Sequence, residues 1–563
     1  MATLQKKISH GCAYWYIVEC RRIKGKPTPI VLAYLGSTER LVNQLLAQAR
    51  AGSLRITSYA HGAVAALWQV ASEIGLIPLL DQHLPTQQRD GLSVGETLTL
   101  AAIHRVLKPA SKRSFAEWAA TTTLPALARF SPPALTSQHF WDQMAVVSES
   151  ALESIEEALA QKLVAELGLT LDLLFYDTTN FFTYLASSNE RSRLCRRGHN
   201  KQKRMDLRQF NLALLVSRAT LIPLFSAVYE GNQPDQRQFP RLLGQLRRRL
   251  TAINQEVEDL TLVLDKGNQS AAIQETLSRL QLHWVGSLSS VYRRVLLEVP
   301  SKDFDEIELA NGSKVLAHRC EHEVFGQQQL VVVIQSERLR VGQLRGFTSA
   351  LAQALQELAT LKTSLATGPR RTNPAAVQAR IARLLARENL AEVVKVAVEE
   401  VNGRVRISYA VDQPQCEHLK TEVLGKKILF TNRRDWTERE VIEAYYGLGR
   451  IERVFRHLKD PWHLAVRPQY HWTDQKIRVH TFCCLLGLML VGLLDWKAKR
   501  AGIKIGPARL LDELGRIRES VIIEASGGPG KPRIRRQLEE MSEERRTLHA
   551  AMQVGIYTPY PHK

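Results

Sequence analysis

The sequence has few cysteines, no internal repeat, and no apolar run that we expect to cross a membrane. Seven cysteines in 563 residues are too few for a disulfide scaffold, so a reducing compartment fits the composition. The best apolar run, residues 481–494, ends at Asp495 and is shorter than the roughly 20 residues that a membrane span needs. We expect this run to form a buried core helix. The N-terminus lacks the apolar stretch of a signal peptide, so we expect the protein to stay in the cytoplasm.

Acidic residues are fewer than basic ones. Lys and Arg number 76 against 56 Asp and Glu, which gives a formal net charge of +20 and a pI near 9.7. An excess of this size predicts a polyanionic partner. Nucleic acid is favoured over an acidic membrane because no basic amphipathic helix stands out. Hydrophobic residues at 45% are typical of a folded globular protein, and the length predicts several domains.

The hydrophobic pattern predicts a multidomain α/β fold. Residues 13–36 predict two strands joined by a basic turn, and helical periodicity dominates from about 39 to 166. The elements expected after that are, in chain order, strand 171–177, a hairpin of strands 210–217 and 221–229, helix 235–250, strand 260–265, helix 269–280, strand 283–288, strands near 303–337, helices near 341–365 and 373–389, strands near 391–411, and strand 426–431 before a capped helix. This order predicts a ribonuclease H-like core interrupted by an insertion.

The same pattern divides the chain into six segments. We expect an N-terminal β-hairpin and helix at 1–52, a helical region that binds DNA ends at 53–168, the first part of the core at 169–290, an inserted α+β domain at 291–424, the second part of the core at 425–500, and a helical tail at 501–563. The tail contains a flexible joint at 526–532. A helix at about 534–553 could pair two chains.

Asp177 and Asp265 each close an apolar strand. A charge there is costly unless something compensates it, and strand ends at the open edge of a mixed sheet are where sites assemble. Each residue also has an ordinary structural explanation. Asp177 could cap the turn that follows it, and Asp265 could be a turn residue before Gly267.

The helix after residue 437 carries a third acid. Thr437 and Glu440 predict a capping box at its start. Tyr445, Glu452 and Lys459 then follow at intervals of seven residues, so they project from nearly the same helix face. The alternative is a surface helix on which Glu452 only pairs with the basic residues at 456 or 459.

Two Asp and one Glu would supply oxygen ligands for two divalent ions roughly 3.5–4 Å apart. Magnesium suits such a site because it prefers a few carboxylates, retained waters and substrate phosphate, and we expect Mn²⁺ to substitute for it. One ion would activate water or a 3′-hydroxyl, and the other would stabilise the leaving oxygen.

These residues resemble the DDE transposases of bacterial insertion sequences. The resemblance rests on Asp177 in Phe-Tyr-Asp-Thr-Thr, Asp265 in Val-Leu-Asp-Lys-Gly-Asn, and the series Tyr445, Glu452 and Lys459, and it runs from about residue 171 to 497. Specifically, the chain looks like the IS-four superfamily, which inserts a partly β domain between the second Asp and the Glu. That superfamily has a Tyr-Arg-Glu-Lys signature.

One position departs from the signature. The signature arginine is expected four residues before the Glu, where this chain has Leu448. Arg450 is the candidate replacement, although it points to a different part of the helix. The departure concerns a phosphate contact and leaves the metal-ligand residues in place.

The resemblance implies a DNA transposase with endonuclease and polynucleotidyl transferase activity. Asp177, Asp265 and Glu452 would be the catalytic metal ligands, and Tyr445 and Lys459 would grip phosphates beside the cleaved bond. Water would first nick the strand at the end of the element, and the freed 3′-hydroxyl would then attack target DNA. The implied partners are the terminal inverted repeats, target DNA and a second copy of the chain in the synaptic complex. The implied location is the nucleoid of a bacterial cytoplasm.

Two basic segments are candidates for contact with DNA. Further candidates on the helix of the third acid are Arg450 and Arg456. The first segment, residues 191–204, would open beside the first acid, although it could also be a solvated basic loop. The second follows the third acid and includes Trp472, which would stack on an unpaired base or lie in the core. The candidates in these two segments are Arg196, Arg197, Lys201, Lys203, Arg204, Arg467 and Trp472.

Two other functions remain open from the sequence. A nuclease of the same fold would cut DNA without joining strands, and a non-catalytic derivative would only bind DNA. The triplets 320–322 and 416–418 both read Cys-Glu-His, but Cys-x-His is not a usual spacing for structural zinc. We therefore expect no zinc site there.

Overall fold

The computed structural model describes residues 2–23, 26–49, 55–169, 171–186, 188–200, 202–218, 220, 222–253, 259–265, 270–288, 294–367, 373–387, 389–401, 403–460, 464–467, 469–524 and 532–554. The chain forms two compact units. Unit 1 contains Met1–Val70, Lys112–His139 and Lys497–Lys563, and unit 2 contains Ala71–Ser111 and Phe140–Trp496. Three chain segments therefore build unit 1, whereas the regions of all three predicted acids lie in unit 2.

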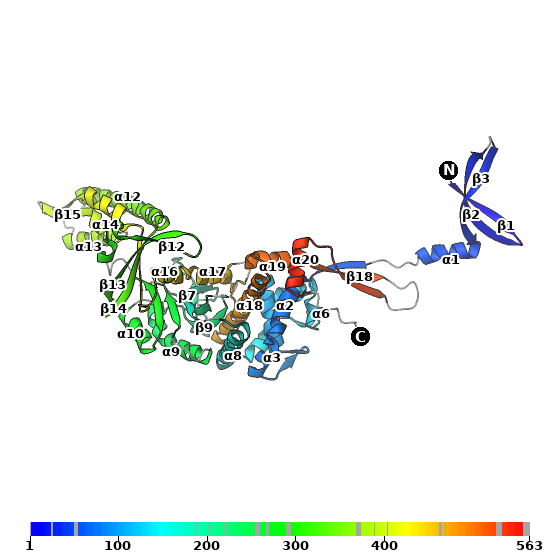
Figure 1. The fold of residues 1–563 in the computed structure, drawn as a ribbon, viewed down its shortest axis with the longest axis horizontal. Coiled ribbons are helices and arrows are strands. Elements are labelled where there is room, and N and C mark those ends of the chain that lie inside the picture. The colour runs from blue at the N-terminus through cyan, green and yellow to red at the C-terminus, as the bar shows by residue number, and fades with distance from the viewer. Residues whose placement is uncertain are drawn as a thin grey trace. The chain divides into compact units, whose positions relative to one another are not determined.

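A mixed nine-stranded sheet forms the centre of unit 2 (Figure 1). Its strand order is β12-β13-β14-β17-β11-β10-β7-β8-β9. Strands β7, β10 and β11 are parallel to one another, and every other neighbouring pair is antiparallel. The strands are β7 (Leu173–Thr183), β8 (Arg208–Ser217), β9 (Pro223–Glu230), β10 (Thr261–Leu264), β11 (His283–Ser287), β12 (Asp305–Glu308), β13 (Lys314–Val324), β14 (Gln327–Gln335) and β17 (Lys426–Thr431).

Different helices pack on the two faces of this sheet. One face joins a large apolar core with α9 (Asp235–Ile253), α10 (Ala271–Arg279) and α12 (Glu337–Thr367). Tyr176 of β7 packs against Phe239 of α9 in that core, with ring centroids 4.6 Å apart. The opposite face carries α16 (Glu438–Tyr446) and α17 (Gly449–Lys459), and Figure 1 shows these helices along the other side of the strands.

The expected elements from 171 to 288 are present, and all but the first lie within a few residues of their expected bounds. The strand expected at 171–177 continues to Thr183. The strands expected near 303–337 are β12, β13 and β14, and they extend the central sheet because β17 pairs with both β11 and β14. The strands expected near 391–411 form a separate two-stranded sheet, β15 (Val394–Val401) and β16 (Arg404–Val411). A mixed α/β fold is therefore confirmed.

The remaining helices enclose these sheets or belong to unit 1. They are α1 (Thr38–Ala49), α2 (Gly62–Glu73), α3 (Leu76–His83), α4 (Val94–Leu107), α5 (Phe115–Ala120), α6 (Leu124–Leu127), α7 (Ser137–Ala145), α8 (Glu149–Leu167), α11 (Arg294–Leu297), α13 (Pro374–Leu385), α14 (Leu390–Val393), α15 (Gln413–His418), α18 (Asp474–Arg500), α19 (Pro507–Gly515) and α20 (Glu543–Ala551). Helix α18 is long and apolar enough to cross a membrane by length and composition, but 89% of its apolar stretch is buried inside the fold. This agrees with the core helix expected at 481–494.

Unit 1 differs from the expected pattern at both ends of the chain. The N-terminal sheet has three strands rather than two, β1 (Ala2–Ser9), β2 (Cys12–Ile23) and β3 (Lys26–Ser37). Strand β1 is exposed along its whole length, and Lys6 interrupts the alternation of Ala2, Leu4 and Ile8, so the sequence marks this strand only weakly.

The expectation of a wholly helical C-terminal tail is wrong. Residues 518–524 and 533–538 are strands β18 (Arg518–Glu524) and β19 (Arg533–Leu538), which form a sheet with β4 (Arg55–Ala60). The helix expected from 534 begins only at Glu543 because the residues before it pair with β18. A short two-stranded ribbon, β5 (Gln88–Arg89) with β6 (Leu92–Ser93), completes the strands. The joint expected at 526–532 lies, except for Pro532, outside the described residues.

Candidate active site

Strands β7 and β10 bring two acids side by side. They pair in parallel up to Leu264 opposite Tyr176, and Asp265 and Asp177 are the next residues of the two strands. Because side chains alternate along a strand, both acids face away from the core that contains Tyr176 and Leu264. The register alone therefore places two carboxylates next to each other on the face that carries α16 and α17.

The expectation that Asp177 ends its strand is wrong. Asp177 lies in the middle of β7, which continues to Thr183 by pairing with β8. The neighbouring strand β10 is the one that ends at this level, so Asp177 lies beside the open end of β10. The side chains from Asp177 to Asn180 are half-buried for this reason, between fully buried residues on either side. Asp177 also caps no helix, although its carboxylate accepts a hydrogen bond of 2.7 Å from the Thr178 N–H.

Helix α17 passes over these acids because both of its ends are tied to β7. Gly447, at the junction of α16 and α17, lies so close to Phe175 that an added Cβ would stand 2.3 Å from the Phe175 ring. At the other end, the Lys459 ammonium donates to the Thr179 hydroxyl. Phe175, Asp177 and Thr179 share one face of β7. Glu452 lies between Gly447 and Lys459 along the helix, and this places it over the stretch of strand that contains Asp177.

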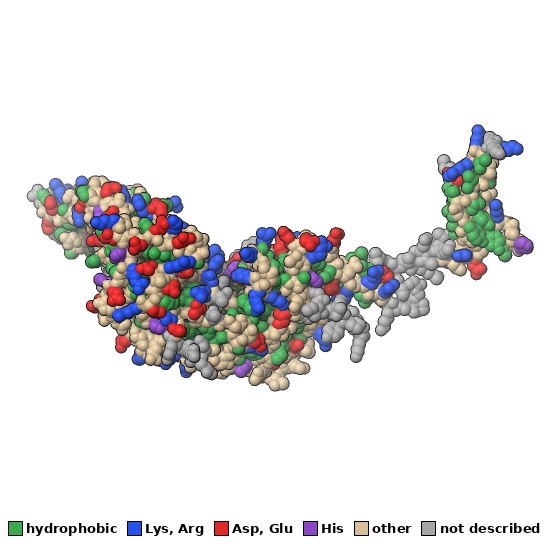
Figure 2. All heavy atoms as spheres, in the orientation of Figure 1, with side chains coloured by type: hydrophobic (Ala, Val, Ile, Leu, Met, Phe, Trp, Pro, Cys, Tyr) green, Lys and Arg blue, Asp and Glu red, His purple; other side chains and the backbone are tan. Residues whose placement is uncertain are grey.

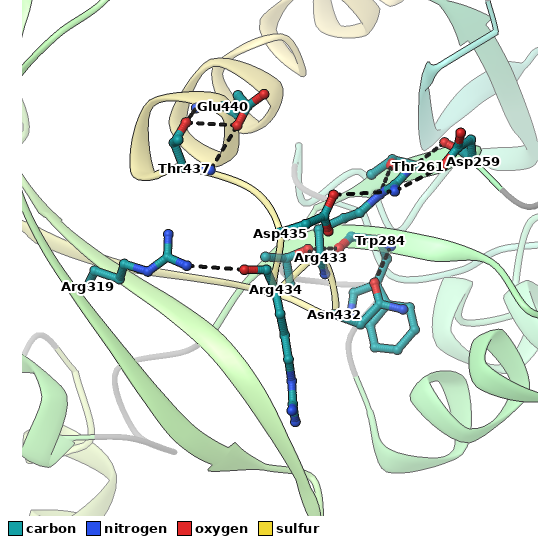
Figure 3. A network of polar contacts seen from close by, with 11 residues as sticks. Asp259, Thr261, Trp284, Arg319, Asn432, Arg433, Arg434, Asp435, Thr437 and Glu440 are labelled. Carbon is teal, nitrogen blue, oxygen red and sulfur yellow. Dashed lines mark hydrogen bonds and ion pairs between the residues drawn. The ribbon is translucent and has the colours of Figure 1, made fainter.

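The loop before α16 fixes where this helix pair begins (Figure 3). Arg433 is buried and donates to the Thr261 hydroxyl at 3.1 Å and to the Asp259 carboxylate at 3.2 Å, at the start of β10. The Trp284 N–H donates to the Asn432 side chain at 3.0 Å, at the start of β11. The loop is therefore pinned to the end of the sheet opposite the acids.

Helix α16 then returns along the sheet toward the acids. Thr437 and Glu440 form the expected capping box at its start, with both reciprocal hydrogen bonds present. At its last turn, the Tyr445 hydroxyl lies 2.9 Å from the Ser287 hydroxyl at the end of β11. The Lys427 ammonium, at the start of β17, lies 4.2 Å from the centre of the Tyr445 ring.

Tyr445 lies within electrostatic range of all three carboxylates, and Lys427 lies within range of two of them. Burial raises the pKa of Tyr445 to about 12, and the charges of Asp265, Glu452 and Asp177 add to this rise. Burial lowers the pKa of Lys427, whereas the charges of Asp265 and Glu452 oppose that shift. All three acids thus act on one phenol, although they come from two strands and a helix.

The donor set is of the kind that suits magnesium, but it does not close into a cage. Within the described ranges, no group of three His, Cys, Asp or Glu side chains is placed to hold a metal ion. Asp177 and Asp265 share one face of the sheet, Glu452 lies on the helix packed against β7, and all three supply only oxygen donors, which Mg²⁺ prefers. The Cys-Glu-His triplets likewise form no such group.

A comparison with protein families identifies the family to which this chain belongs. A family described as "Transposase DDE domain" matches residues 174–488, which is more than half of the chain and contains Asp177, Asp265 and Glu452. The chain belongs to this family of DDE transposases. No curated protein matches it.

Solved transposase structures are similar to this chain only at low levels. A piggyBac transposase synaptic complex with hairpin DNA has 8% identity and a TM-score of 0.36, and the match covers 90% of this chain and 85% of that one. A Mos1 transposase paired-end complex with the left transposon end has 12% identity and a TM-score of 0.15, with 36% and 61% covered. A pre-cleavage Mos1 transpososome has 11% identity and a TM-score of 0.15, over the same shares.

The first basic segment of this transposase-family chain forms an ordered loop anchored to α18. The Asp474 carboxylate, in the first turn of α18, accepts hydrogen bonds from the Ser192 hydroxyl at 2.7 Å and from the N–H groups of Arg193 and Leu194 at 3.0 and 3.1 Å. Of the candidates in this loop, Arg196, Arg197, Lys203 and Arg204 are exposed, and Lys201 lies outside the described residues. Arg204 pairs with Asp206 at 2.7 Å.

The second basic segment is partly built into the fold. Trp472 packs against Trp141 with ring centroids 5.1 Å apart, yet it remains 44% exposed. The Arg467 side chain is half-buried, and its carbonyl accepts from Arg105 at 2.9 Å. Trp472 therefore combines a structural contact with an open ring face, which is compatible with both of its expected roles.

The remaining candidates on α17 diverge. Arg456 is exposed, whereas Arg450 donates to the backbone carbonyl of Arg218. Lys427 and Ser287 face the acids but were not among the candidates from the sequence. Lys427 could have been found from the sequence, because a lysine within a buried strand is unusual. No feature of the sequence marks Ser287 as a site residue. On the face drawn in Figure 2, basic side chains lie among acidic ones rather than in a single patch.

Proposed function

We propose that this protein is a DNA transposase of the IS-four superfamily that cleaves the ends of its element and joins the freed 3′-hydroxyl to target DNA. The observation that carries the proposal is that the register of β7 and β10 brings Asp177 and Asp265 side by side, with α17, the helix of Glu452, packed on β7 within a matched DDE domain. A carboxylate triad on one open face is the arrangement that two-metal phosphoryl transfer requires.

Sheet topology supports a ribonuclease H-like core. Strands β9, β8 and β7 form an antiparallel meander, and β10 and β11 continue from β7 in parallel. The elements that follow, β12 to β16 with α12 to α14, come between the second acid and the third in the chain. The superfamily that the sequence resembles has a partly β insertion at this place.

Asp177, Asp265 and Glu452 would hold two Mg²⁺ ions. When bound, such ions activate a water or hydroxyl nucleophile and stabilise the leaving oxygen. Lys459, held by Thr179 at the end of α17, is placed to bind a phosphate on one side of the acids, since an ammonium is a point charge for phosphate. A tyrosine hydroxyl is protonated at neutral pH, and burial raises the pKa of Tyr445 further, so this hydroxyl would donate to a phosphate oxygen.

DNA is the partner that the charges support. The net charge of +20 and the exposed basic loop after β7 suit a phosphate backbone. We extend the proposal to terminal inverted repeats and target DNA as substrates, a homodimer in the synaptic complex, and a bacterial cytoplasm as the location.

An excision assay tests the proposal. The chain acts on a marker flanked by the ends of its own element, with Mg²⁺ present, and wild type is compared with Glu452→Gln. We expect wild type to excise the marker and the variant to lose at least about 10³-fold in rate, because a metal ligand is removed. Glu438→Gln, on the preceding helix, is the matched control and should remain active.

The outcomes separate the alternatives. Equal activity of wild type and Glu452→Gln would remove Glu452 from the site. Cutting without joined products would favour a nuclease of the same fold. DNA binding without any cutting by wild type would favour a non-catalytic derivative.

A further inference from the structure

We propose that Lys427 is a DNA-binding residue of the active site. It would be a fixed cation that binds a phosphate beside the cleaved bond, in place of the arginine of the Tyr-Arg-Glu-Lys signature, which this chain lacks. The inference rests on the proposed function and adds a residue to it. It also gives a role to a half-buried charge that the three acids and the signature residues leave unexplained.

The strand register places Lys427 on the acid face of the sheet. Leu429 of β17 pairs with Ser287 of β11, whose hydroxyl contacts Tyr445. Lys427 lies two residues from Leu429 along β17, so its side chain points to the same face. Ile428 and Phe430 point to the opposite face and belong to the apolar core.

The adjacent Lys426 shows how this fold treats a lysine that has a structural role. Lys426 points to the other face, where its ammonium donates to the carbonyls of Leu297 at 3.1 Å and Val299 at 2.6 Å. It also lies over the Phe304 ring at 5.2 Å. Its donors are therefore occupied by oxygen acceptors of the fold.

Lys427 is placed differently. Its ammonium lies over the Tyr445 ring at 4.2 Å, and no carboxylate among the described residues forms an ion pair with it. Asp265 and Glu452 nevertheless lie close enough to favour its charge. A half-buried cation that has no hydrogen-bond acceptor within the described part of the chain is costly, so a lysine at this position points to an anionic ligand.

The two positions of α16 and α17 that could have supplied the signature charge do not supply it. Leu448, at the signature position, is only 8% exposed and packs as an apolar residue. Arg450 directs its guanidinium to the backbone of Arg218. The helices thus bring Lys459 to one side of the acids, and the sheet brings Lys427 to the other side, next to Tyr445. A phosphate backbone that crosses the acid face would meet a cation on each side.

Cleavage kinetics with a charge-removing and a charge-keeping variant provide the first test. Single-turnover cleavage of end DNA is measured for wild type, Lys427→Met and Lys427→Arg. We expect Lys427→Met to lose about 10- to 100-fold and Lys427→Arg to recover most of the rate. Lys420→Met, which removes a half-buried charge that pairs with Glu417 at 2.7 Å, is the matched control and should leave the rate unchanged.

The second test asks whether the lost contact is with a phosphate. Each phosphate near the cleaved bond is replaced in turn by an uncharged methylphosphonate. The cleavage rate of each modified DNA is then measured with wild type and with Lys427→Met. At the phosphate that Lys427 binds, the two changes should be non-additive, so that Lys427→Met costs little more on the neutral DNA. Losses that multiply at every position would overturn the proposal, as would a rate loss that Lys427→Arg does not recover.

Equilibrium binding supplies a readout that does not depend on cleavage. The slope of log K for end DNA against log salt should fall by about one for Lys427→Met and stay unchanged for Lys420→Met. An unchanged slope for Lys427→Met would contradict the inference even if wild type fails to cleave. Failure of wild-type cleavage with a changed slope would instead count against the proposed function alone.

Discussion

Tyr176 and Asp177 are neighbours in β7, yet they meet opposite environments. Tyr176 is fully buried against α9, and burial raises the pKa of its phenol well above the usual value. Asp177 is half-buried beside the end of β10. One step along the strand thus separates the apolar core from the face that carries the acids, because side-chain direction alternates with each residue.

A buried histidine in unit 1 gives a prediction about pH. His61 is 3% exposed, and burial lowers its pKa from the usual 6.5 to about 4. Its ring contacts the Thr123 hydroxyl at 2.9 Å and lies 3.8 Å from the Glu519 carboxylate, with His549 also nearby. The unfolded state therefore binds one more proton than the folded state between about pH 6.5 and pH 4, so stability should fall as the pH falls through this window.

The size of this effect follows from the shift. We expect unit 1 to lose up to about 3 kcal/mol of unfolding free energy by pH 4 relative to a His61→Gln variant. Burial raises the pKa of Glu519 and acts in the opposite direction, but Glu519 is present in both proteins and cancels in the difference. Denaturant unfolding at several pH values provides the measurement. Parallel stability curves for the two proteins would contradict the prediction.

The helix pair α16 and α17 is positioned by the loop before it and by a close contact at its junction. The hydrogen bonds of Arg433 fix where the pair begins, and the contact of Gly447 with Phe175 fixes the distance between the helices and β7. Because Glu452 reaches the acids only through this placement, its activity depends on residues that carry no catalytic group.

Gly447→Ala should therefore lower activity through geometry. An added Cβ would stand 2.3 Å from the Phe175 ring, and overpacking of this kind costs about 1–3 kcal/mol. We expect the variant to cleave end DNA at least about tenfold more slowly while it retains affinity for DNA. Cleavage rate and binding affinity are measured on the same DNA.

Gly449 supplies the matched control. An added Cβ at Gly449 meets no atom within 4 Å, so Gly449→Ala should be neutral or stabilising by up to about 1 kcal/mol because alanine favours a helix. Phe175→Leu should recover part of the activity of Gly447→Ala by making room. Equal effects of the two glycine variants would show that the contact with Phe175 does not position the helix.

At the scale of the whole molecule, the ends of the chain belong to one unit. Strand β4, near residue 55, pairs with β18 near residue 520, which in turn pairs with β19. Gly62, at the start of α2, lies against Leu514 and Ile517 so closely that an added Cβ would be 2.4 Å from the Leu514 carbonyl oxygen. The C-terminal segment is thus part of the fold of unit 1 rather than an appended tail.

Removal of residues 501–563 should unfold unit 1 and spare the sheet of unit 2. We expect the amides of β4 to lose protection from hydrogen exchange because their partner strand is gone, while those of β7 and β10 keep theirs. Removal of residues 1–37 is the control, since strands β1 to β3 pair only with one another. Unchanged protection of β4 after the C-terminal truncation would contradict this account.

The sequence by itself determined the local elements and the residue types of the candidate site. Apolar alternation and caps are local signals, so the strands and helices from 171 to 288, the capping box at Thr437 and the buried helix at 481–494 could all be predicted. The motifs around the three acids also indicated the transposase family that the comparison shows.

Only the tertiary structure decided how these pieces meet. Asp177 lies in mid-strand because β10 ends beside it, Lys427 faces the acids because of the register between β17 and β11, and residues 533–538 form a strand because β18 pairs with them. Each of these outcomes depends on a partner far away in the chain. Strand pairing and register are set by long-range contacts, which a local pattern does not contain.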